Sequence, residues 1–388
     1  MDSGNFEGKF YEKYGNRNNK PVLFFSPGRV NLIGGHTDYN GGYVFPCALN
    51  YGTYLLLRKT NSNILKFSTI NFNDDSETEF KGLFVNTGKK WINYPLGVIN
   101  EFLKKEIKLS GMEFLFYGDV PNGAGLSSSA SIEMVTAVAL NEFFNAGLTT
   151  IDLVKMSQKA ENEFVGMNCG IMDQFAVGFG KKDHAIFLNC NSLFFEQVPI
   201  VLNDCSLIIT NTNKRRGLTD SKYNERRGEC DKAVELLQGY KPISNLSELN
   251  SGEIHILEKY IKDPIVRKRA KHVISENDRV VEAVKVLKNN DINRFGELMN
   301  LSHDSLKDDY EVTGFELDTL VYEGRKLPGV IGTRMTGAGF GGCTVSIIKK
   351  ADSAKFMSEL SIAYQKKTGL LPDFYQPEIS DGARKLES

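Results

Sequence analysis

The spacing of hydrophobic residues in the first 120 positions predicts mostly strands. Short runs rich in aromatic and β-branched side chains, bounded by turn or polar residues, are typical of strands. We expect strands at residues 21–25, 43–49, 51–60, 64–72 and 112–120. Residues 91–106 differ, because Ile92, Leu96 and Ile99 recur at helical spacing, and this segment is predicted to be a helix.

Beyond residue 121 the pattern becomes more helical. Residues 121–147 begin as a loop and continue as a helix, and residues 151–166 form a second helix that ends at Gly166. The further elements that we expect are helices at residues 223–238 and within 264–301, and strands at residues 184–190, 206–212 and 342–350.

The length of the chain, 388 residues, favours two domains over one. A small shift in composition near residues 195–205 sets the expected boundary. We therefore expect an N-terminal domain of residues 1–200 and a C-terminal domain of residues 201–388.

The charge balance excludes general binding to polyanions. There are 47 Lys and Arg residues against 48 Asp and Glu, so the net charge is −1. Binding to nucleic acid or to an anionic membrane surface needs a basic excess. No apolar run approaches the ~18 residues that a membrane-spanning helix requires. We expect neither a nucleic acid nor a membrane as a partner, although a local basic site for a small anion is compatible with this composition.

The six cysteines indicate a reducing compartment. None of them forms a C-x-x-C pair, which argues against a zinc ribbon. They are interpreted as buried thiols rather than disulfides. The polar first twenty residues lack the apolar stretch of a secretory signal. These features predict a cytoplasmic protein, and we expect it to be a monomer.

A glycine- and serine-rich stretch, residues 123–130, reads GAGLSSSA. It follows a predicted strand and opens a predicted helix, where backbone N–H groups and the helix dipole can bind phosphate. The hydroxyls of Ser127, Ser128 and Ser129 can donate to phosphate oxygens or face a magnesium ion. A plain serine-capped helix start fits the same residues. No G-x-x-x-x-G-K-[ST] string occurs in the chain, so this is not a Walker-type loop.

A second glycine-rich stretch, residues 337–342, reads GAGFGG and matches G-x-G-x-x-G. A dinucleotide fingerprint must open a helix, whereas this stretch is followed by a predicted strand. We interpret it as a tight turn at which the backbone approaches a ligand or another loop. A turn that merely joins two elements is the alternative.

Polar candidates for chemistry lie in two glycine-containing segments. Residues 26–46 read SPGRVNLIGGHTDYNGGYVFP and place Arg29, His36 and Asp38 in a flexible frame. Asp173 lies in the mostly apolar segment 169–180, where an isolated carboxylate costs free energy unless it is paired or functional. Backbone donors could equally satisfy that carboxylate. Nothing in the local sequence around Glu161 or Tyr223 marks either residue as functional.

Taken together, these motifs resemble the GHMP kinases, and within them the galactokinase family. The matching segments run from residue 26 to about residue 346, and residues 380–386 extend the likeness nearly to the end. They are SPGRVNLIGGHTDYNGG, GLSSSASIEM, CGIMDQFAVGFG, NTNKRRGLTDSKYNERR, SHDSLKDDYEVT, GTRMTGAGFGGCTVSI and SDGARKL.

The resemblance implies an α+β, two-domain GHMP kinase fold with mixed sheets and helices, and an active site in the cleft between the domains. It implies transfer of the γ-phosphate of ATP to the C1 hydroxyl of a galactose-type sugar, in galactose catabolism by the Leloir pathway. The implied partners are therefore the small molecules ATP and sugar, with Mg2+ as the metal.

The family's functional residues carry over onto matching positions of this chain. Asp173 is the implied proton acceptor and Arg29 the charge stabiliser, while Ser129 and Glu161 are the implied magnesium ligands. The implied sugar-binding residues are Gly35, His36, Thr37, Asp38, Gly170, Asp173 and Tyr223. The implied nucleotide-binding residues are Ser68, Gly123, Ala124, Gly125, Leu126, Ser127, Ser128 and Ser129, with Trp91 or Tyr94 as a wall for adenine.

One position departs from the family's pattern. Galactokinases usually have glutamate directly before the histidine, where it is taken to bind the C6 hydroxyl, and this chain has Gly35. The missing charge-assisted hydrogen bond is worth roughly 1.5–3 kcal/mol. The gap is compatible with a galactokinase that has a weaker or water-mediated C6 contact. It is also compatible with a sugar altered at C6, either galacturonate, which a glutamate would repel, or arabinose, which lacks C6.

A galactose sensor without catalytic activity is a rival from another class. The known sensor lacks part of the serine–alanine run after the phosphate loop. In this chain that run, SSSASIE, is intact, and both Asp173 and Arg29 are present. The sequence therefore favours an enzyme.

Overall fold

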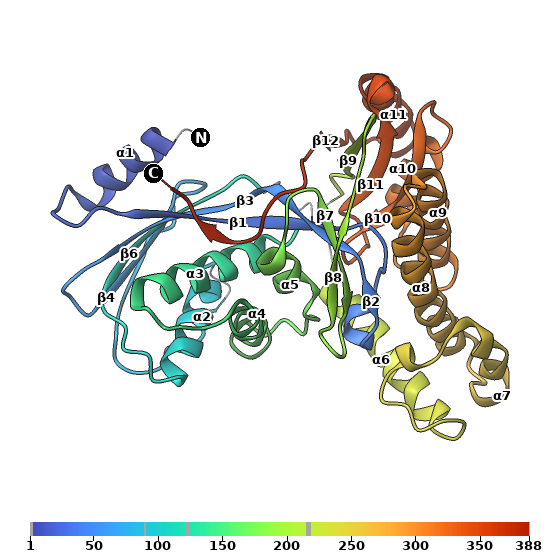
Figure 1. The fold of residues 1–388 in the computed structure, drawn as a ribbon, viewed down its shortest axis with the longest axis horizontal. Coiled ribbons are helices and arrows are strands. Elements are labelled where there is room, and N and C mark those ends of the chain that lie inside the picture. The colour runs from blue at the N-terminus through green and yellow to red at the C-terminus, as the bar shows by residue number, and fades with distance from the viewer. Residues whose placement is uncertain (1–2, 89–90, 121–124, 215–218, 388) are drawn as a thin grey trace.

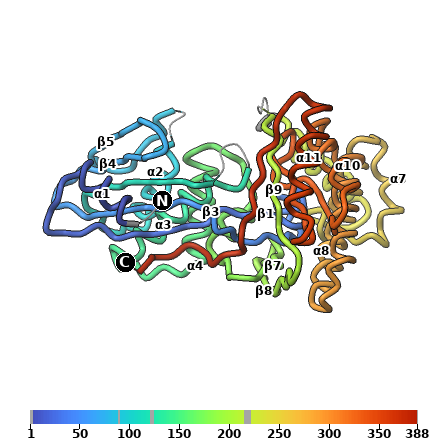
Figure 2. The backbone as a smooth tube through the Cα atoms, turned by 90° about the horizontal axis from the view of Figure 1, so that it is seen from above, coloured from blue at the N-terminus to red at the C-terminus, as the bar shows by residue number. Residues whose placement is uncertain are grey.

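Two lobes make up the computed structural model, which describes residues 3–88, 91–120, 125–214 and 219–387 (Figure 1). One lobe is built on a six-stranded sheet and the other on a four-stranded sheet. The view from above shows the same division, with the first and last described segments of the chain on the same lobe (Figure 2).

The six-stranded sheet has the strand order β13-β1-β3-β6-β4-β5. Neighbouring strands are antiparallel except β4 and β6, which are parallel, so the sheet is mixed. The bounds of these strands are β1 Val22–Asn31, β3 Pro46–Lys59, β4 Ile64–Thr69, β5 Ser76–Glu79, β6 Met112–Gly118 and β13 Arg384–Lys385.

Helices cover both faces of this sheet. Phe67 and Phe114 point to the main core, which forms against four helices on one face. Leu56 and Leu115 point to the other face and pack against Phe10 of the first helix. This opposite orientation follows from the two-residue period of a strand. The helices are α1 Ser3–Tyr14 on one side, and α2 Asn93–Lys104, α3 Ser128–Phe144, α4 Thr150–Lys159 and α5 Met172–Phe179 on the other.

The second lobe is a four-stranded antiparallel sheet between two pairs of helices. Its strand order is β10-β11-β9-β12. Each face of this sheet has its own apolar core, and successive residues of β9 point to different cores. Ile209 packs with α8 and α9, and Ile208 packs with α10 and α11. The bounds are β9 Cys205–Asn211, β10 Val330–Thr336, β11 Cys343–Lys349, β12 Asp373–Tyr375, α8 Pro264–Lys288, α9 Ile292–Asp308, α10 Phe315–Gly324 and α11 Ser353–Thr368.

A small three-stranded sheet and a helical segment complete the fold. The small sheet has the order β2-β7-β8. A separate apolar cluster packs α6 and α7 against α8. The bounds are β2 Tyr43–Val44, β7 His184–Asn189, β8 Phe195–Pro199, α6 Thr219–Leu237 and α7 Leu257–Tyr260. Among the described residues, no helix combines the length and the apolar character needed to cross a membrane.

The predicted α+β class with mixed sheets is confirmed, whereas several element boundaries differ. Residues 46–59 form one long strand instead of two, because Gly52 lets β3 pass close to β1: a Cβ there would lie 2.6 Å or less from Phe25 and the Ser26 carbonyl. The predicted helix at residues 151–166 is α4 followed by a π-helical turn, Ala160–Val165, that ends at Gly166 with φ +90°. The stretch 264–301 contains parts of two helices, α8 and α9.

Several elements lie outside the predicted segments. Among them are α1, α5, α10 and α11. The division into residues 1–200 and 201–388 remains a prediction. β13, from the end of the chain, pairs with β1 and so returns to the first lobe.

A buried ion pair attaches α1 to the six-stranded sheet. Arg58 of β3 donates to Glu113 of β6 (Nε–Oε2 2.9 Å), and both side chains are 1% exposed. The same guanidinium donates to the carbonyls of Tyr14 (3.1 Å) and Gly15 (3.0 Å) at the end of α1. Arg17 also approaches Glu113 at 3.3 Å, but its side chain is 52% exposed.

We expect Arg58→Met to lower the free energy of unfolding by about 3–5 kcal/mol, because it leaves a buried carboxylate without its main partner. The midpoint of urea unfolding measures the change. Arg294→Met is the matched control, because Arg294 pairs with Glu282 and Glu297 at the surface and its loss should leave the midpoint nearly unchanged. Equal midpoints for the two variants would contradict the role given to Arg58.

Candidate active site

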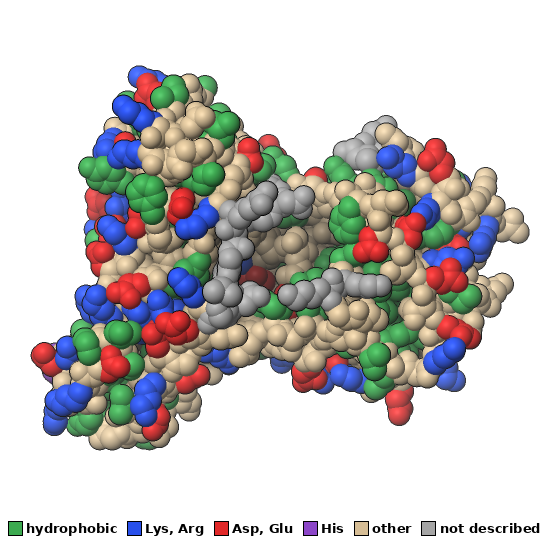
Figure 3. Space-filling view, turned by 180° about the vertical axis from the view of Figure 1, so that it is seen from behind, with side chains coloured by type: hydrophobic (Ala, Val, Ile, Leu, Met, Phe, Trp, Pro, Cys, Tyr) green, Lys and Arg blue, Asp and Glu red, His purple; other side chains and the backbone are tan. Residues whose placement is uncertain are grey.

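A cavity of about 430 Å³ lies between the two lobes. The space-filling view shows the molecule hollowed at this place (Figure 3). The lining comes from β1 and the loop after it, the loop before α3, the segment leading into α5, the first turns of α6 and the turn after β10. Segments distant in sequence thus meet at one cavity.

An arginine–aspartate pair lies in this cavity. Arg29, on β1, is 5% exposed, and Asp173 lies in the first turn of α5. The guanidinium donates to both carboxylate oxygens, Nε to Oδ1 at 2.8 Å and Nη2 to Oδ2 at 2.9 Å. Ser127 Oγ donates to Oδ2 at 2.5 Å. A bidentate pair of this kind fixes both the position and the orientation of the carboxylate.

The same arginine holds the loop before α3. Its Nη1 donates to the Gly125 carbonyl at 2.7 Å, and its backbone N–H donates to the Leu126 carbonyl at 3.1 Å. Ser127 adopts a left-handed conformation with φ +60° as the N-cap of α3. The backbone N–H groups that begin α3 therefore lie close to Asp173, where a helix N-terminus favours an anion.

His36 is buried and neutral. It has φ +61°, and its Nδ1 lies 2.9 Å from the Tyr39 hydroxyl. The Tyr39 hydroxyl lies 2.8 Å from that of Tyr310, and the His36 ring lies 5.0 Å from the Tyr310 ring. Burial lowers the pKa of His36 to about 3. Its Nε2 forms no hydrogen bond of normal geometry with a described residue, although the backbone of Ala338 lies nearby, and both residues line the cavity.

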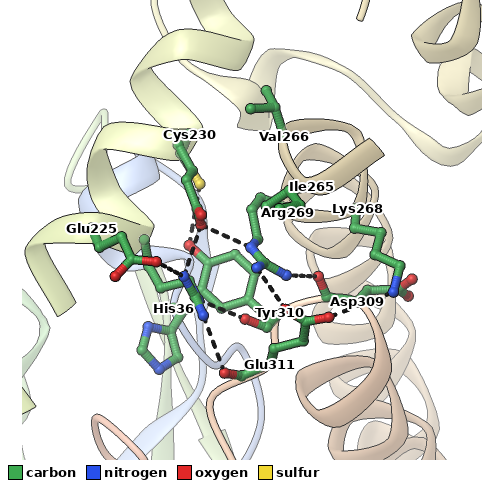
Figure 4. Close-up of polar contacts among 12 residues, drawn as sticks. His36, Glu225, Cys230, Ile265, Val266, Lys268, Arg269, Asp309, Tyr310 and Glu311 are labelled. Atoms are coloured by element: carbon green, nitrogen blue, oxygen red, sulfur yellow. Dashed lines mark hydrogen bonds and ion pairs between the residues drawn. The ribbon is translucent and has the colours of Figure 1, made fainter. Parts of the chain in front are cut away.

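A layer of ion pairs behind His36 fixes Tyr310 (Figure 4). Arg226 Nε, on α6, donates to the Tyr310 carbonyl at 2.8 Å. Arg269, on α8, donates to Glu229 and Glu311 at 2.8 Å each, and to the Asp309 carbonyl at 2.7 Å. These contacts hold α6, which carries Tyr223, against the segment that supports the His36 ring.

Asp38 and Gly170 are in close contact. A Cβ at Gly170 would lie 2.2 Å from Asp38 Oδ2, so only glycine leaves room for this carboxylate. Burial, together with the nearby Asp173, raises the pKa of Asp38 to about 6. Asp38 is therefore mainly ionised at neutral pH, and an ionised carboxylate only accepts hydrogen bonds.

Two buried glutamates, Glu161 and Glu133, lie near the loop before α3. Gln174 Nε2 donates to Glu161 Oε2 at 2.5 Å and to Glu133 Oε2 at 3.0 Å. Burial raises the pKa of both glutamates, that of Glu133 well above its usual range. Ser129 lies close enough to Glu161 to oppose the rise in its pKa, so the two side chains are neighbours.

Most of the predicted site residues line the cavity together. They are Arg29, Gly35, His36, Asp38, Gly125, Leu126, Ser127, Ser128, Ser129, Glu161, Gly170, Asp173 and Tyr223. Gly123 and Ala124 lie outside the described residues. The turn at 337–342 approaches the loop before α3, since a Cβ at Gly337 would lie 3.3 Å from the Gly125 carbonyl.

Two predicted residues are not brought to the cavity. Thr37 is buried, and its hydroxyl donates to the carbonyls of Gly34 and Tyr43 at 3.0 and 2.7 Å, which is a structural contact. Ser68 accepts a hydrogen bond from Tyr14 of α1 at 2.8 Å. It pairs with Leu115, on the sheet face that α1 covers, so it lies opposite the face against which α3 packs.

Tyr39, which lies in the glycine-bracketed segment, also lines the cavity, as do Asn31 and Arg334, which sequence reasoning did not single out. Arg334 is part of GTRMTGAGFGG, a stretch that carried the resemblance, but nothing in its local sequence marked it as facing a ligand. Tertiary packing alone brings it there.

Comparisons with known proteins agree with the fold and the site. Residues 93–181 match the family model of the GHMP kinases N-terminal domain, and residues 283–366 match that of the C-terminal domain. Residues 8–59 match the galactokinase galactose-binding signature. The fold also resembles the mevalonate kinase of Methanococcus jannaschii, with a TM-score of 0.68 over 94% of this chain and all of that one, at 20% identity.

Relatives of higher sequence identity identify the family within this superfamily. Curated galactokinases of Clostridium beijerinckii and Fusobacterium nucleatum are both 52% identical to this chain, over 94% of it and 94–95% of their own lengths. The structure of Lactococcus lactis galactokinase complexed with galactose matches with a TM-score of 0.96, at 42% identity over 99% of both chains. The fold and site thus define a kinase of the GHMP class. Within that class, the chain belongs to the galactokinase family.

The pKa of Asp38 predicts a pH dependence of sugar binding. Because this carboxylate is protonated below about pH 6, it loses acceptor capacity there, and galactose affinity should fall as the pH drops from 7 to 5. Calorimetric titration without nucleotide measures the effect, since phosphate groups titrate in the same range.

Asp38→Asn is the control variant for this titration. It should bind galactose weakly and with little change between pH 5 and 7. A wild-type affinity that stays constant over this range would contradict the role given to Asp38.

Proposed function

We propose that this protein transfers the γ-phosphate of ATP to the C1 hydroxyl of α-D-galactose, giving galactose 1-phosphate in galactose catabolism. The observation that carries the proposal is the Arg29–Asp173 pair, held between the end of the phosphate loop and the residues His36 and Asp38. The names of the full-length relatives give the same activity.

Asp173 is suited to receive the proton of the attacking hydroxyl. It is held on both oxygens by Arg29, and its side chain is 25% exposed, so it faces the cavity. A carboxylate within hydrogen-bond reach of a hydroxyl can take its proton as the hydroxyl attacks. It also orients that hydroxyl, which matters because phosphoryl transfer depends mostly on positioning.

Arg29 has a second role at the transferring group. Its guanidinium lies at the point where Asp173, Ser127 and the Gly125 carbonyl meet. A fixed cation there offsets the charge that the phosphoryl oxygens carry during transfer. His36 Nε2 and Asp38 would hold ring hydroxyls of the sugar, and Tyr223 would cover it, since its ring lies 5.8 Å from the His36 ring.

Ser129 and Glu161 have donors that fit Mg2+. A hydroxyl and a carboxylate are hard oxygen ligands, and magnesium in kinases is typically bound by one or two such groups plus phosphate oxygens. No group of three or more acidic, His or Cys side chains that could hold a metal is found within the described ranges, so phosphates would complete the shell. Bound there, the ion would neutralise phosphate charge.

The expected monomer and the cytoplasmic location belong to the same proposal. All six cysteines are free thiols, and Cys47, Cys205, Cys230 and Cys343 are buried. Free thiols are typical of a reducing compartment.

The first test is Asp173→Asn. We expect it to keep galactose affinity, because the amide is close in size to the carboxylate, and to lower kcat by about 10²–10⁴-fold through loss of the base. ADP release measures turnover and calorimetry measures galactose binding. Near-normal turnover in this variant would exclude Asp173 as the base, and no ADP release from the wild type would exclude the kinase.

The second test compares Glu161→Gln with Glu133→Gln. Removing the charge of a metal ligand should weaken the Mg2+ dependence of ATP binding, followed by calorimetry at increasing Mg2+ without sugar. Glu133 is the matched control, because it accepts a hydrogen bond from the same Gln174 amide but is not among the residues that line the cavity. Equal Mg2+ dependence in the two variants would contradict the assignment of Glu161.

A further inference from the structure

Arg334 is a buried arginine that forms no ion pair with a carboxylate of the described residues. Four other arginines are similarly buried, namely Arg29, Arg58, Arg226 and Arg269. Each of those four forms at least one ion pair with Asp or Glu. Arg334 is 1% exposed and forms none with any described residue. A buried charge that is not paired within the protein is costly unless a ligand compensates it.

The contacts of Arg334 leave one end of its guanidinium free. Nε lies 3.1 Å from Ser302 Oγ, and Nη1 donates to the Asn31 carbonyl at 2.9 Å. No hydrogen bond from Nη2 to a described residue accompanies these two contacts. This atom lies only 2.6 Å from the position that a Cβ at Gly35 would take. Both Gly35 and Arg334 line the cavity.

The carboxylate of Glu276, which interacts with Arg334 through Ser302, has other partners. Glu276 pairs with Arg279 (Nε–Oε2 2.6 Å) and accepts hydrogen bonds from Ser302 and from the backbone N–H groups of Gly34 and Gly35. Although burial opposes it, the Arg279 cation keeps the pKa of Glu276 below its usual range. Two arginines thus face one carboxylate, and the cluster carries an excess positive charge beside Gly35.

Arg334 lines the same cavity as Arg29 and Asp173. Its contact Asn31 and the catalytic Arg29 are two residues apart on β1, which is about 6–7 Å along a strand. That length is comparable with the distance across a six-membered sugar ring. A sugar whose C1 hydroxyl lies at Asp173 can therefore present an exocyclic group to Gly35 and Arg334.

We propose that Gly35 and Arg334 form a subsite for a carboxylate on the sugar, so that the enzyme accepts hexuronic acids of the galactose type, such as D-galacturonate, besides galactose. The inference rests on the proposed function, because it uses the same C1 phosphorylation. Nη2 donates to the carboxylate, and the absence of a side chain at position 35 leaves room for it. The acidic residues Asp38 and Asp173 contact Gly170 and Arg29 instead.

The test measures ADP release by the full-length protein with ATP, Mg2+ and either D-galactose or D-galacturonate. The wild type should use galacturonate with kcat/KM within about tenfold of its galactose value. Gly35→Glu should lower kcat/KM for galacturonate by about 100-fold, because its carboxylate pairs with Arg334 and repels the substrate. The ratio of galactose to galacturonate activity should therefore rise.

Gly35→Gln is the matched control. It fills the same space without charge, so it should retain about tenfold more galacturonate activity than Gly35→Glu. Position 35 has no left-handed backbone requirement, and the Cβ would first meet the far end of the Arg334 side chain, so both variants should fold. Calorimetry of galacturonate binding without ATP provides a readout that does not depend on turnover.

Several results would overturn the proposal. Galactose turnover with galacturonate activity below about 1% would exclude the subsite. If Gly35→Glu and Gly35→Gln lost galacturonate activity equally, the loss would be due to the filled space and not to the added charge. If acetate stabilised the protein but galacturonate did not bind, Arg334 would be a site for a free anion and not for a sugar carboxylate. In contrast, galacturonate turnover without galactose turnover would support the subsite and refute the proposed galactose activity.

Discussion

Arg29 has three kinds of partner at once, and the site is assembled around it. Its side chain holds both oxygens of Asp173 on α5 and the Gly125 carbonyl in the loop before α3, while its own backbone N–H binds Leu126. β1 thus fixes Asp173 and the loop before α3 relative to each other. Because the pair is largely shielded from water, its geometry is held more firmly than that of a surface ion pair.

Burial sets the protonation state of the groups around this pair. It keeps His36 neutral, with Nδ1 next to the Tyr39 hydroxyl and Nε2 without a hydrogen bond of normal geometry to a described residue. It raises the pKa of Asp38 to about 6 and that of Glu133 well above its usual range. The cavity therefore combines one neutral imidazole, carboxylates that can accept from hydroxyl groups and a fixed cation. This is a suitable environment for binding a polyol next to a polyanion.

Local sequence predicted those parts of the site that depend on short-range chemistry. The loop before α3 and the tight turn at 337–342 were identified by their glycines, and the resemblance carried Asp173 and Glu161 to the cavity. The binding roles of Thr37 and Ser68 stay predictions, and their side chains lie away from the cavity, because a residue in a matching motif can point into the protein or to the far face of a sheet. Arg334 was missed because its importance comes from being buried without an ion pair to a described residue, which the local sequence does not reveal.

The sequence by itself determined the class, the order of the motifs and the departure at Gly35, because spacing and residue type are sufficient to define glycine loops and amphipathic elements. The tertiary structure decided which charges are compensated. Arg29 contacts Asp173 across 144 positions of sequence, and Arg334 meets Gly35 without an ion pair to any carboxylate of the described residues. Pairing and burial are properties of the packed chain, since they depend on contacts between residues distant in sequence.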